Sequence, residues 1–392
     1  MRRIWRALAV VVALLLLSGC SAAADALRPD PTWVPQPEGP PPADLPQPDQ
    51  TRAAPTPGPP GAPGGPEAGT ADDPSVVATG LTLPWGLAVL PDGTALVGER
   101  TTGRLLVVQP QRAPAKPVRT LTGLDTTGDG GLLGLALSPG FARDGLVYAY
   151  LTTRTDNRVV RFALRGAVTP VLTGIPKGRT GNGGRISFGS DGLLYVGTGD
   201  AGKPALAADR RSLAGKVLRV TTFGRPAGQN PDPASPVYSI GHGPIAGLCL
   251  SGSDQVYTTE PASAALDEID RVEAGRDYGF PGGTRSGAAG AARTVPAPTG
   301  GLGGCAVIER GLFVASSTGK RMYALPLDGG GEVGTATSFL AGAYGRLRTV
   351  VAGSDGALWL TTTNKDGAGK PTAQDDRVIR ILPPTGSTNS PA

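Results

Sequence analysis

The sequence predicts an all-β protein: a six-bladed β-propeller preceded by a signal peptide and a disordered, proline-rich tether. Two observations predict the propeller. Pairs of apolar segments joined by short polar turns recur every 45 to 62 residues, and helical patterns are short throughout. The order of residues at the N-terminus predicts export. We expect a lipoprotein signal peptide at 1–19, the lipidated cysteine and tether at 20–75, the propeller at 76–384 and a disordered tail at 385–392.

The N-terminus has the order of a bacterial lipoprotein signal. Three arginines precede an unbroken apolar stretch, Ala7 to Leu17, which is shorter than the ~20 residues that a membrane-spanning helix needs. Small residues then lead to Cys20, where a lipoprotein is acylated on sulfur. The alternative is an ordinary signal peptide with a chance cysteine, but the chain has only three cysteines. We predict that Cys20 carries a lipid and holds the protein at the outer face of the cytoplasmic membrane.

The segment after Cys20 predicts a tether. Residues 21–75 hold 16 of the chain's 39 prolines, with almost no aliphatic pattern between them. Such a segment cannot bury enough apolar surface to fold and stays extended. We therefore expect the globular part to be carried away from the lipid membrane.

Charge excludes one class of partner. The net charge of +5 is spread along the chain, and no basic cluster with interleaved aromatic residues occurs. We expect no nucleic-acid partner, and we expect a monomer. Cys249 and Cys305 are the remaining cysteines, and in an oxidising compartment they can form one disulfide. Two separate buried thiols are the alternative.

Six copies of one unit fill the globular part. Each copy is an apolar strand, a tight turn and a second apolar strand, and Asp-Gly between two such strands is a strong hairpin signal. A further strand follows in most units, and a strand near Ser75–Thr79 is expected to pair with the last unit and close the ring. The only helix-like windows are short, at 205–213 and 262–270. The six turns lie near Gly93, Gly145, Gly192, Asp254, Gly311 and Gly356.

Several segments of the globular part resemble the pyrroloquinoline-quinone (PQQ)-dependent glucose/sorbosone dehydrogenases, which are six-bladed propellers. The run Gly199 to Arg219 is, in addition, similar to the actinobacterial LppZ-type lipoproteins, a lipid-anchored branch of that family. The segments that carry the resemblance include Leu83–Ala88, Gly128–Gly134, Asp156–Arg161, Asn182–Arg185, Gly199–Gly202, Ser212–Lys216, Tyr238–His242, Tyr278–Pro281 and Gly345–Arg348.

The resemblance implies where a catalytic base would lie. In active members a histidine before the Asn-Gly-Gly-Arg segment takes the proton of the sugar hydroxyl, and the matching position here is Gly181. The one histidine of the chain, His242, matches a different family position, and the two cofactor-facing residues after it are replaced by Gly243 and Pro244. No residue is therefore assigned as the catalytic base.

Other positions matched by the resemblance keep polar side chains. Arg346 and Arg348 match a pair of arginines that binds the carboxylates of PQQ, a task that suits guanidinium. Asp129, Asn182, Arg185 and Asp200 are the other candidate cofactor contacts, although each could instead serve only the structure. The expected lysine of the fifth blade falls near Thr318, with Lys320 close by. Calcium is a possible cofactor, and its segment is reduced to Thr259-Glu260-Pro261, with Glu260 and Glu99 as candidate ligands.

Three functions follow as hypotheses. The first is a PQQ-dependent dehydrogenase that acts on CH–OH groups of sugars. The second is a non-catalytic envelope propeller that binds a glycan, small molecule or protein, with a ligand at the propeller centre. The third is a calcium-dependent, lactonase-like hydrolase, in which Glu99, Asn182, Asp200 and Glu260 would converge on the metal.

Overall fold

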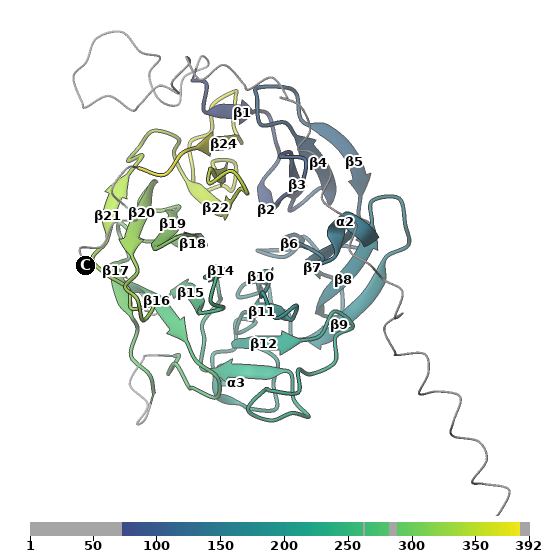
Figure 1. The fold of residues 1–392 in the computed structure, drawn as a ribbon, viewed down its shortest axis with the longest axis vertical. Helices are drawn as coiled ribbons and strands as arrows, with labels where there is room; N and C mark the ends of the chain where they lie inside the picture. The colour runs from purple at the N-terminus through teal and green to yellow at the C-terminus, as the bar shows by residue number, and fades with distance from the viewer. Residues whose placement is uncertain (1–72, 262, 282–287, 385–392) are drawn as a thin grey trace, which may run out of the picture. The chain divides into compact units, whose positions relative to one another are not determined.

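The computed structural model describes residues 73–261, 263–281 and 288–384, and the described chain forms a ring of β-sheets (Figure 1). The predicted signal peptide, Cys20, most of the tether and the tail 385–392 lie outside the described residues. Within those that are described, no helix is long and apolar enough to cross a membrane.

Six four-stranded antiparallel sheets make up the ring, which confirms the predicted six-bladed propeller. Each sheet runs outward from an inner strand near the centre (Figure 1). The first blade contains β2 (Pro84–Val89), β3 (Ala95–Glu99), β4 (Arg104–Val108) and β5 (Lys116–Thr120). The second contains β6 (Leu132–Leu137), β7 (Leu146–Thr152), β8 (Asn157–Ala163) and β9 (Thr169–Ile175). The third contains β10 (Gly183–Phe188), β11 (Leu194–Thr198), β12 (Lys216–Val220) and β13 (Val237–Ile240).

The other three blades repeat this plan. The fourth contains β14 (Gly247–Leu250), β15 (Val256–Pro261), β16 (Leu266–Val272) and β17 (Arg293–Pro296). The fifth contains β18 (Leu302–Ile308), β19 (Gly311–Ser316), β20 (Arg321–Pro326) and β21 (Thr337–Phe339). The sixth contains β22 (Leu347–Ala352), β23 (Leu358–Thr362), β24 (Val378–Ile381) and β1 (Val76–Ala78).

The two ends of the propeller chain close the ring together. Strand β1 pairs antiparallel with β24, with Val76 opposite Ile379 and Ala78 opposite Val378. The sequence predicted this pairing for the strand near Ser75–Thr79. It covers the outer edge of β24, so that strand is not left as the unpaired edge of the sixth blade.

Glycines on the inner strands let neighbouring blades approach closely around the axis. A Cβ on Gly86 of β2 would lie 2.4 Å from the carbonyl oxygen of Leu133, and one on Gly134 of β6 would lie 2.4 Å from that of Gly184. No side chain fits at such distances. These inner-strand glycines therefore allow the blades to pack closely around the axis of the ring. Larger apolar residues fill the spaces between the sheets.

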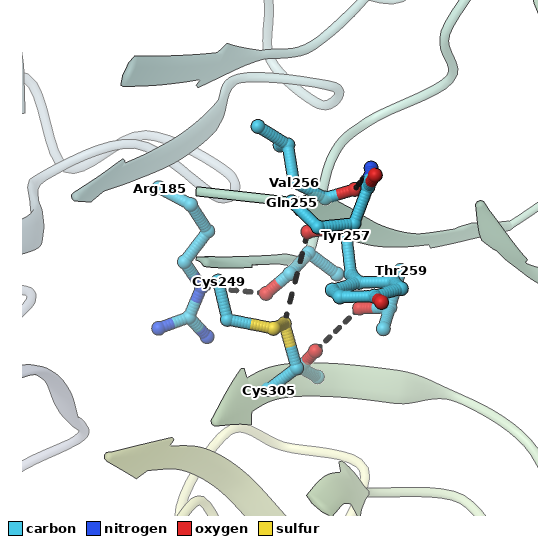
Figure 2. Close-up of a disulfide and its surroundings, with 9 residues drawn as sticks. Arg185, Cys249, Gln255, Val256, Tyr257, Thr259 and Cys305 are labelled. Carbon is cyan, nitrogen blue, oxygen red and sulfur yellow. Dashed lines mark hydrogen bonds between the residues drawn. A yellow bond between two sulfur atoms is a disulfide. The ribbon is translucent and has the colours of Figure 1, made fainter. Parts of the chain in front are cut away.

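A disulfide joins the inner strands of the fourth and fifth blades (Figure 2). Cys249 lies on β14 and Cys305 on β18, with their Cα atoms 5.7 Å apart. Both are buried, and the sulfur of Cys305 lies 3.9 Å from the carbonyl oxygen of Tyr257. The bridge thus ties two adjacent blades beside the channel.

Helices are few among the described residues. They are α2 (Phe141–Asp144) and α3 (Ala205–Ala208), and α3 lies in one of the helix-like windows of the sequence. The other window, 262–270, was predicted wrongly, because its second half belongs to strand β16. That strand pairs with β15 on one side and β17 on the other, and such pairing overrides a weak local preference for helix.

Candidate functional site

A pocket of about 300 Å³ opens at the end of the ring where the inner strands begin. We call it the central pocket. Its lining includes an aromatic residue, two acidic residues and one arginine, and residues on or next to all six blades contribute to it. Its lining residues are Trp85, Asp129, Gly183, Pro244, Ile245, Ala246, Asp267, Gly301, Leu302, Ser317 and Arg348.

A second cavity, of about 370 Å³, lies further along the same inner strands and takes residues from all six blades. The side chain of Arg185 lies between the two spaces, because it lines this second cavity while its guanidinium stacks 3.7 Å from the ring of Trp85. Arg185 therefore forms the floor beneath the central pocket.

Arg185 is held by backbone and hydroxyl acceptors rather than left open to a ligand. Its guanidinium donates to the carbonyl oxygen of Ala246, to Oγ1 of Thr349 at 2.9 Å and to the carbonyl oxygen of Arg348 at 3.3 Å. These contacts join the third, fourth and sixth blades. Burial and the nearby charge of Arg348 hold the pKa of Arg185 well below its ordinary value. Each of the three guanidinium nitrogens of Arg185, a predicted cofactor contact, thus already has an acceptor within the protein.

Arg348 behaves differently. Among the described residues its guanidinium forms no hydrogen bond or ion pair, and it lies 5.3 Å from the centre of the Trp85 ring, on the wall of the central pocket. Burial, then repulsion from Arg100, lowers its pKa to about 10, and Arg346 acts in the same direction. The positive charge of Arg348 is therefore placed where an anion would stabilise it.

Arg346 lies next to Arg348 in the sequence but is already paired. Its guanidinium binds Oδ2 of Asp366 through two nitrogens, at 2.8 and 3.1 Å. Arg100 donates to the carbonyl oxygens of Gly128 and Gly130. Of the two arginines that the sequence singled out, the structure leaves only Arg348 with its donors unused.

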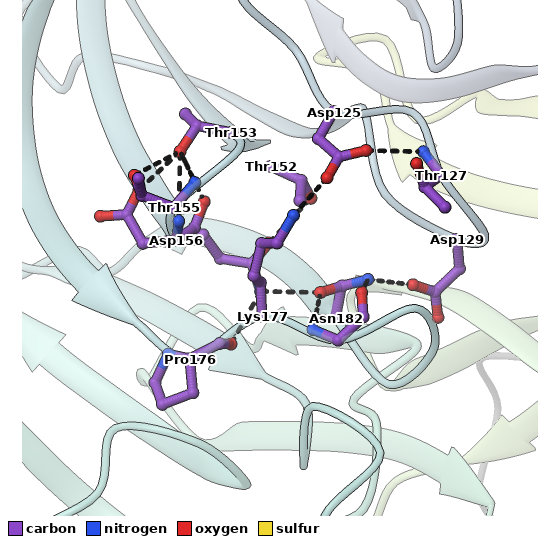
Figure 3. Close-up of polar contacts among 12 residues, drawn as sticks. Asp125, Thr127, Asp129, Thr152, Thr153, Thr155, Asp156, Pro176, Lys177 and Asn182 are labelled. Atoms are coloured by element: carbon purple, nitrogen blue, oxygen red, sulfur yellow. Dashed lines mark hydrogen bonds and ion pairs between the residues drawn. The ribbon is translucent and has the colours of Figure 1, made fainter.

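The predicted contacts Asp129 and Asn182 bind each other (Figure 3). Nδ2 of Asn182 donates to Oδ1 of Asp129, and the amide nitrogen of Gly181 donates to Oδ2 at 2.8 Å. Asn182 is buried, and its Oδ1 accepts from Asn157 and from the amide of Gly178, both at 3.0 Å. Asn182 thus shapes the loop, whereas Asp129 also reaches the central pocket.

The carboxylate of Asp200 fills the place of a side chain at Gly181. Gly181 has a φ of +75°, and a Cβ built on it would lie 2.2 Å from Oδ1 of Asp200. Asp200 is buried, and burial, together with the nearby charge of Asp129, raises its pKa. Gly181 itself does not line the central pocket, and a larger residue at 181 would have to displace Asp200.

The candidate metal ligands do not meet. Glu99, on β3, accepts from Arg104 and Thr102 and from the amide of Thr82. Oε1 of Glu260, on β15 in the fourth blade, instead lies 2.7 Å from Nδ1 of His242, and its Oε2 accepts from the amide of Gly243. None of Glu99, Asn182, Asp200 and Glu260 lines the central pocket. The four-residue calcium ring that the lactonase hypothesis placed at the centre was therefore wrong.

Lys320 does not reach the pocket either. It is exposed in the turn between β19 and β20, whereas its neighbour Ser317 lines the pocket. Sequence reasoning assigned no role to Trp85, Asp267, Ser317 or Arg100. Trp85 stood in a motif that we quoted, and the Asp267-Glu268 pair was a visible acidic signal. Nothing local in the sequence marked Ser317 or Arg100.

The fold and the site define a class: a six-bladed propeller with an arginine-bearing pocket at the start of its inner strands. Residues 81–297 match the Glucose / Sorbosone dehydrogenase family. Because this match covers more than half of the chain, the protein belongs to that family, as its sequence motifs indicated.

Individual relatives agree with the family. The chain is similar to the PQQ-bound aldose sugar dehydrogenase of Streptomyces coelicolor, at 40% identity and a TM-score of 0.75, covering 78% of this chain and 96% of that one. It is 27% identical over 249 residues to quinoprotein glucose dehydrogenase B of Acinetobacter calcoaceticus, covering 53% of this chain and 52% of that protein. A third similarity, 27% over 217 residues, is to an aldose sugar dehydrogenase of Escherichia coli (strain K12), covering 50% of this chain and 58% of that protein. The alignments thus span between half and three fifths of the length of these curated relatives.

Proposed function

We propose that this chain is an exported, lipid-anchored propeller that binds PQQ in the central pocket and oxidises sugars slowly, because Gly181 supplies no base. One observation carries the proposal: the guanidinium of Arg348 lines the pocket without a hydrogen-bond or ion-pair partner among the described residues. A carboxylate is the ligand that suits such a group, and a charge-assisted hydrogen bond to it contributes roughly 1.5–3 kcal/mol.

The pocket fits a planar, carboxylate-bearing cofactor in part. Arg348 would hold a carboxylate, and the ring of Trp85 beside it offers an apolar face. Arg346 could add a second contact only by sharing or leaving Asp366. When bound, PQQ would supply the two-electron acceptor for oxidation of a CH–OH group. Calcium finds no equivalent support in this pocket, since neither of its candidate ligands, Glu260 and Glu99, lines it.

Proton removal is the weak step of the proposed reaction. A neutral imidazole serves this purpose in active relatives, as the resemblance implies, but Gly181 has no side chain. Asp129 is the carboxylate on the pocket wall nearest to this position, since it accepts from the amide of Gly181. Loss of a general base typically costs about 10²–10⁴ in rate. If no residue removes the proton at all, the propeller would bind its ligand without oxidising it.

Location rests on the N-terminal signal, and one structural feature supports it. The bridge between Cys249 and Cys305 is of a kind that persists in oxidising compartments. We expect a Cys20→Ser variant to lose lipid labelling and to leave the membrane fraction. Full retention of that variant on membranes would contradict the anchor.

A titration tests the function. We expect PQQ to quench the tryptophan fluorescence of the full chain saturably, and dye reduction with a panel of aldoses to be slow. Because a side chain at 181 needs the space of the Asp200 carboxylate, the double variant Gly181→His, Asp200→Gly should then raise turnover by roughly 10²-fold, the lower end of a general base's contribution. Gly181→Ala, Asp200→Gly is the matched control, because it makes the same room but brings no imidazole. Absence of PQQ binding in every variant would overturn the proposal.

A further inference from the structure

A second group of ionisable side chains lies outside the central pocket, at the contact between the third and fourth blades. It consists of His242, just after β13, Glu260 on β15 and Asp270 on β16. All three are at most 2% exposed. One ligand-capable atom from each lies within 4.8 Å of the others, and this is the one such group of three among the residues that the structure describes.

The imidazole in this group is oriented from both sides. Its Nδ1 lies 2.7 Å from Oε1 of Glu260, and its Nε2 lies 2.8 Å from Oγ of Ser239. The ring also stacks on Tyr278, with the ring centres 4.7 Å apart. If Nε2–H donates to Ser239, Nδ1 presents its lone pair toward the two carboxylates. A histidine that binds a metal is generally fixed in this way through its other nitrogen.

The carboxylates are incompletely satisfied. Oε2 of Glu260 accepts from the amide of Gly243. Asp270 lies 3.5 Å from Oγ1 of Thr258, and its Oδ1 accepts no hydrogen bond from any described residue. Burial raises the pKa of both acids, and the nearby charge of Glu260 raises that of Asp270 further, whereas the contact with Asp270 acts to lower that of Glu260. Lys216 is buried nearby and donates to three backbone carbonyls.

Two buried acids beside an imidazole need a proton between them or a cation among them. A divalent cation would satisfy the free oxygen of Asp270 and would neutralise both carboxylates at once. We propose that Nδ1 of His242, Glu260 and Asp270 form a buried structural site for a divalent transition metal of the Zn²⁺ class.

The donor set selects the kind of metal. One imidazole nitrogen with two carboxylates suits Zn²⁺ or a neighbouring transition ion, whereas Ca²⁺ takes six to eight oxygen ligands. Three protein ligands leave one tetrahedral position, and Thr258 or a water could complete it. Because none of the three residues lines the central pocket, the role of the group would be to hold the third and fourth blades together rather than to act on substrate. This inference is independent of PQQ binding.

Metal analysis of the full chain, purified without chelators, tests the proposal. We expect about one equivalent of metal per chain after equilibration with Zn²⁺. The melting temperature should rise by about 5–10 °C at saturating Zn²⁺ relative to EDTA. Ca²⁺ should have no such effect. Asp270→Asn and Glu260→Gln should lose both the metal and the response to Zn²⁺. Glu268→Gln, on the same strand but outside the group, is the matched control and should keep both.

A shared proton predicts the opposite pattern. In that case wild-type protein would contain no metal, Zn²⁺ would not change its melting temperature, and Asp270→Asn would raise stability in EDTA as in Zn²⁺. That result would overturn the proposal, as would metal retained by both variants. If the variants were less stable overall, the comparison of each with itself in Zn²⁺ and in EDTA would still decide the matter.

Discussion

Arg185 and Arg348 lie against the same tryptophan, yet they serve different parts of the propeller. Arg185, at 3.7 Å from the Trp85 ring, donates to acceptors on two other blades and forms the floor of the central pocket. Arg348, at 5.3 Å from the ring, lines the wall of the pocket, and its guanidinium has no hydrogen-bond partner among the described residues. Both arginines were candidate cofactor contacts from sequence.

The difference shows that satisfaction of the donors, rather than residue type or position in a motif, separates a structural arginine from a binding one. A guanidinium has five N–H donors, and a fold that uses them leaves little for a ligand. We call the pocket wall around Arg348 the mouth. Substitution of Arg185 in the floor should therefore change the stability of the protein, and substitution of Arg348 at the mouth should change ligand binding. The four predictions below test this separation, from the largest expected effect to the smallest.

The disulfide beside the floor should have the largest effect. Cys249 and Cys305 both line the second cavity, on the far side of Arg185 from the central pocket, and their sequence separation is 56 residues. In the chain-entropy treatment, a loop of this length corresponds to about 4 kcal/mol of stability. We expect a Cys249→Ala, Cys305→Ala double variant to lose about that much in urea denaturation. It should still bind PQQ with wild-type affinity at 25 °C. A loss below about 1 kcal/mol would show that the bridge constrains little.

Removal of the floor arginine should come next. Arg185→Ala would leave Thr349 and two backbone carbonyls without a donor and would open a cavity under Trp85. We expect a loss of about 3 kcal/mol in the free energy of unfolding, measured by denaturant titration. Arg158→Ala is the control, because its pair with Asp156 is partly exposed and should contribute less than about 1 kcal/mol. Equal losses in the two variants would contradict the claim that Arg185 contributes more to stability than a partly exposed arginine does.

Folding stability should depend on pH through Asp376, which supports the segment that carries Arg346. Oδ1 of buried Asp376 accepts from the amide of Asn364 at 2.6 Å, and Asn364 in turn accepts from the amide of Arg346. Burial raises the pKa of Asp376 to about 6, above the ~3.9 of an unfolded chain. The protonated form is therefore favoured by folding. Its contribution is full below about pH 4, declines as pH rises to about 6, and is lost above that.

The size of this decline is about 2–3 kcal/mol at most. Asp376→Asn keeps the acceptor oxygen but cannot ionise, so it should gain stability over wild type at pH 7 and match it near pH 4. Thermal melts across this range measure the difference. Asp355→Asn, in a partly exposed pair with Arg380, should not show the same crossover. A difference between Asp376→Asn and wild type that is constant with pH would contradict the raised pKa.

Sequence reasoning recovered the architecture because the fold is written in local repeats. Short turns between apolar strands, four of them Asp-Gly, indicated six units, and the strand near Ser75 closed the ring as expected. Asp129 and Arg348 were found on the pocket wall because they lie in quoted motifs. What the sequence could not supply was the set of partners. The tie of Arg185 to Thr349 joins residues 164 apart, and the meeting of Glu260 with His242 and Asp270 depends on how two blades pack.

The smallest effect on stability, and the sharpest test of the comparison, is expected at the mouth. Arg348→Gln removes a cation that burial and neighbouring arginines make unfavourable, so the free energy of unfolding should change by less than about 1 kcal/mol. Binding should behave otherwise, because the loss of a charge-assisted contact to a carboxylate weakens affinity by roughly 10- to 100-fold. Fluorescence titration with PQQ measures this, and Arg271→Gln, on the outer strand β16, is the matched control. If Arg348→Gln bound PQQ as tightly as wild type, its open guanidinium would not be the anion contact, and the distinction between floor and mouth would rest on stability alone.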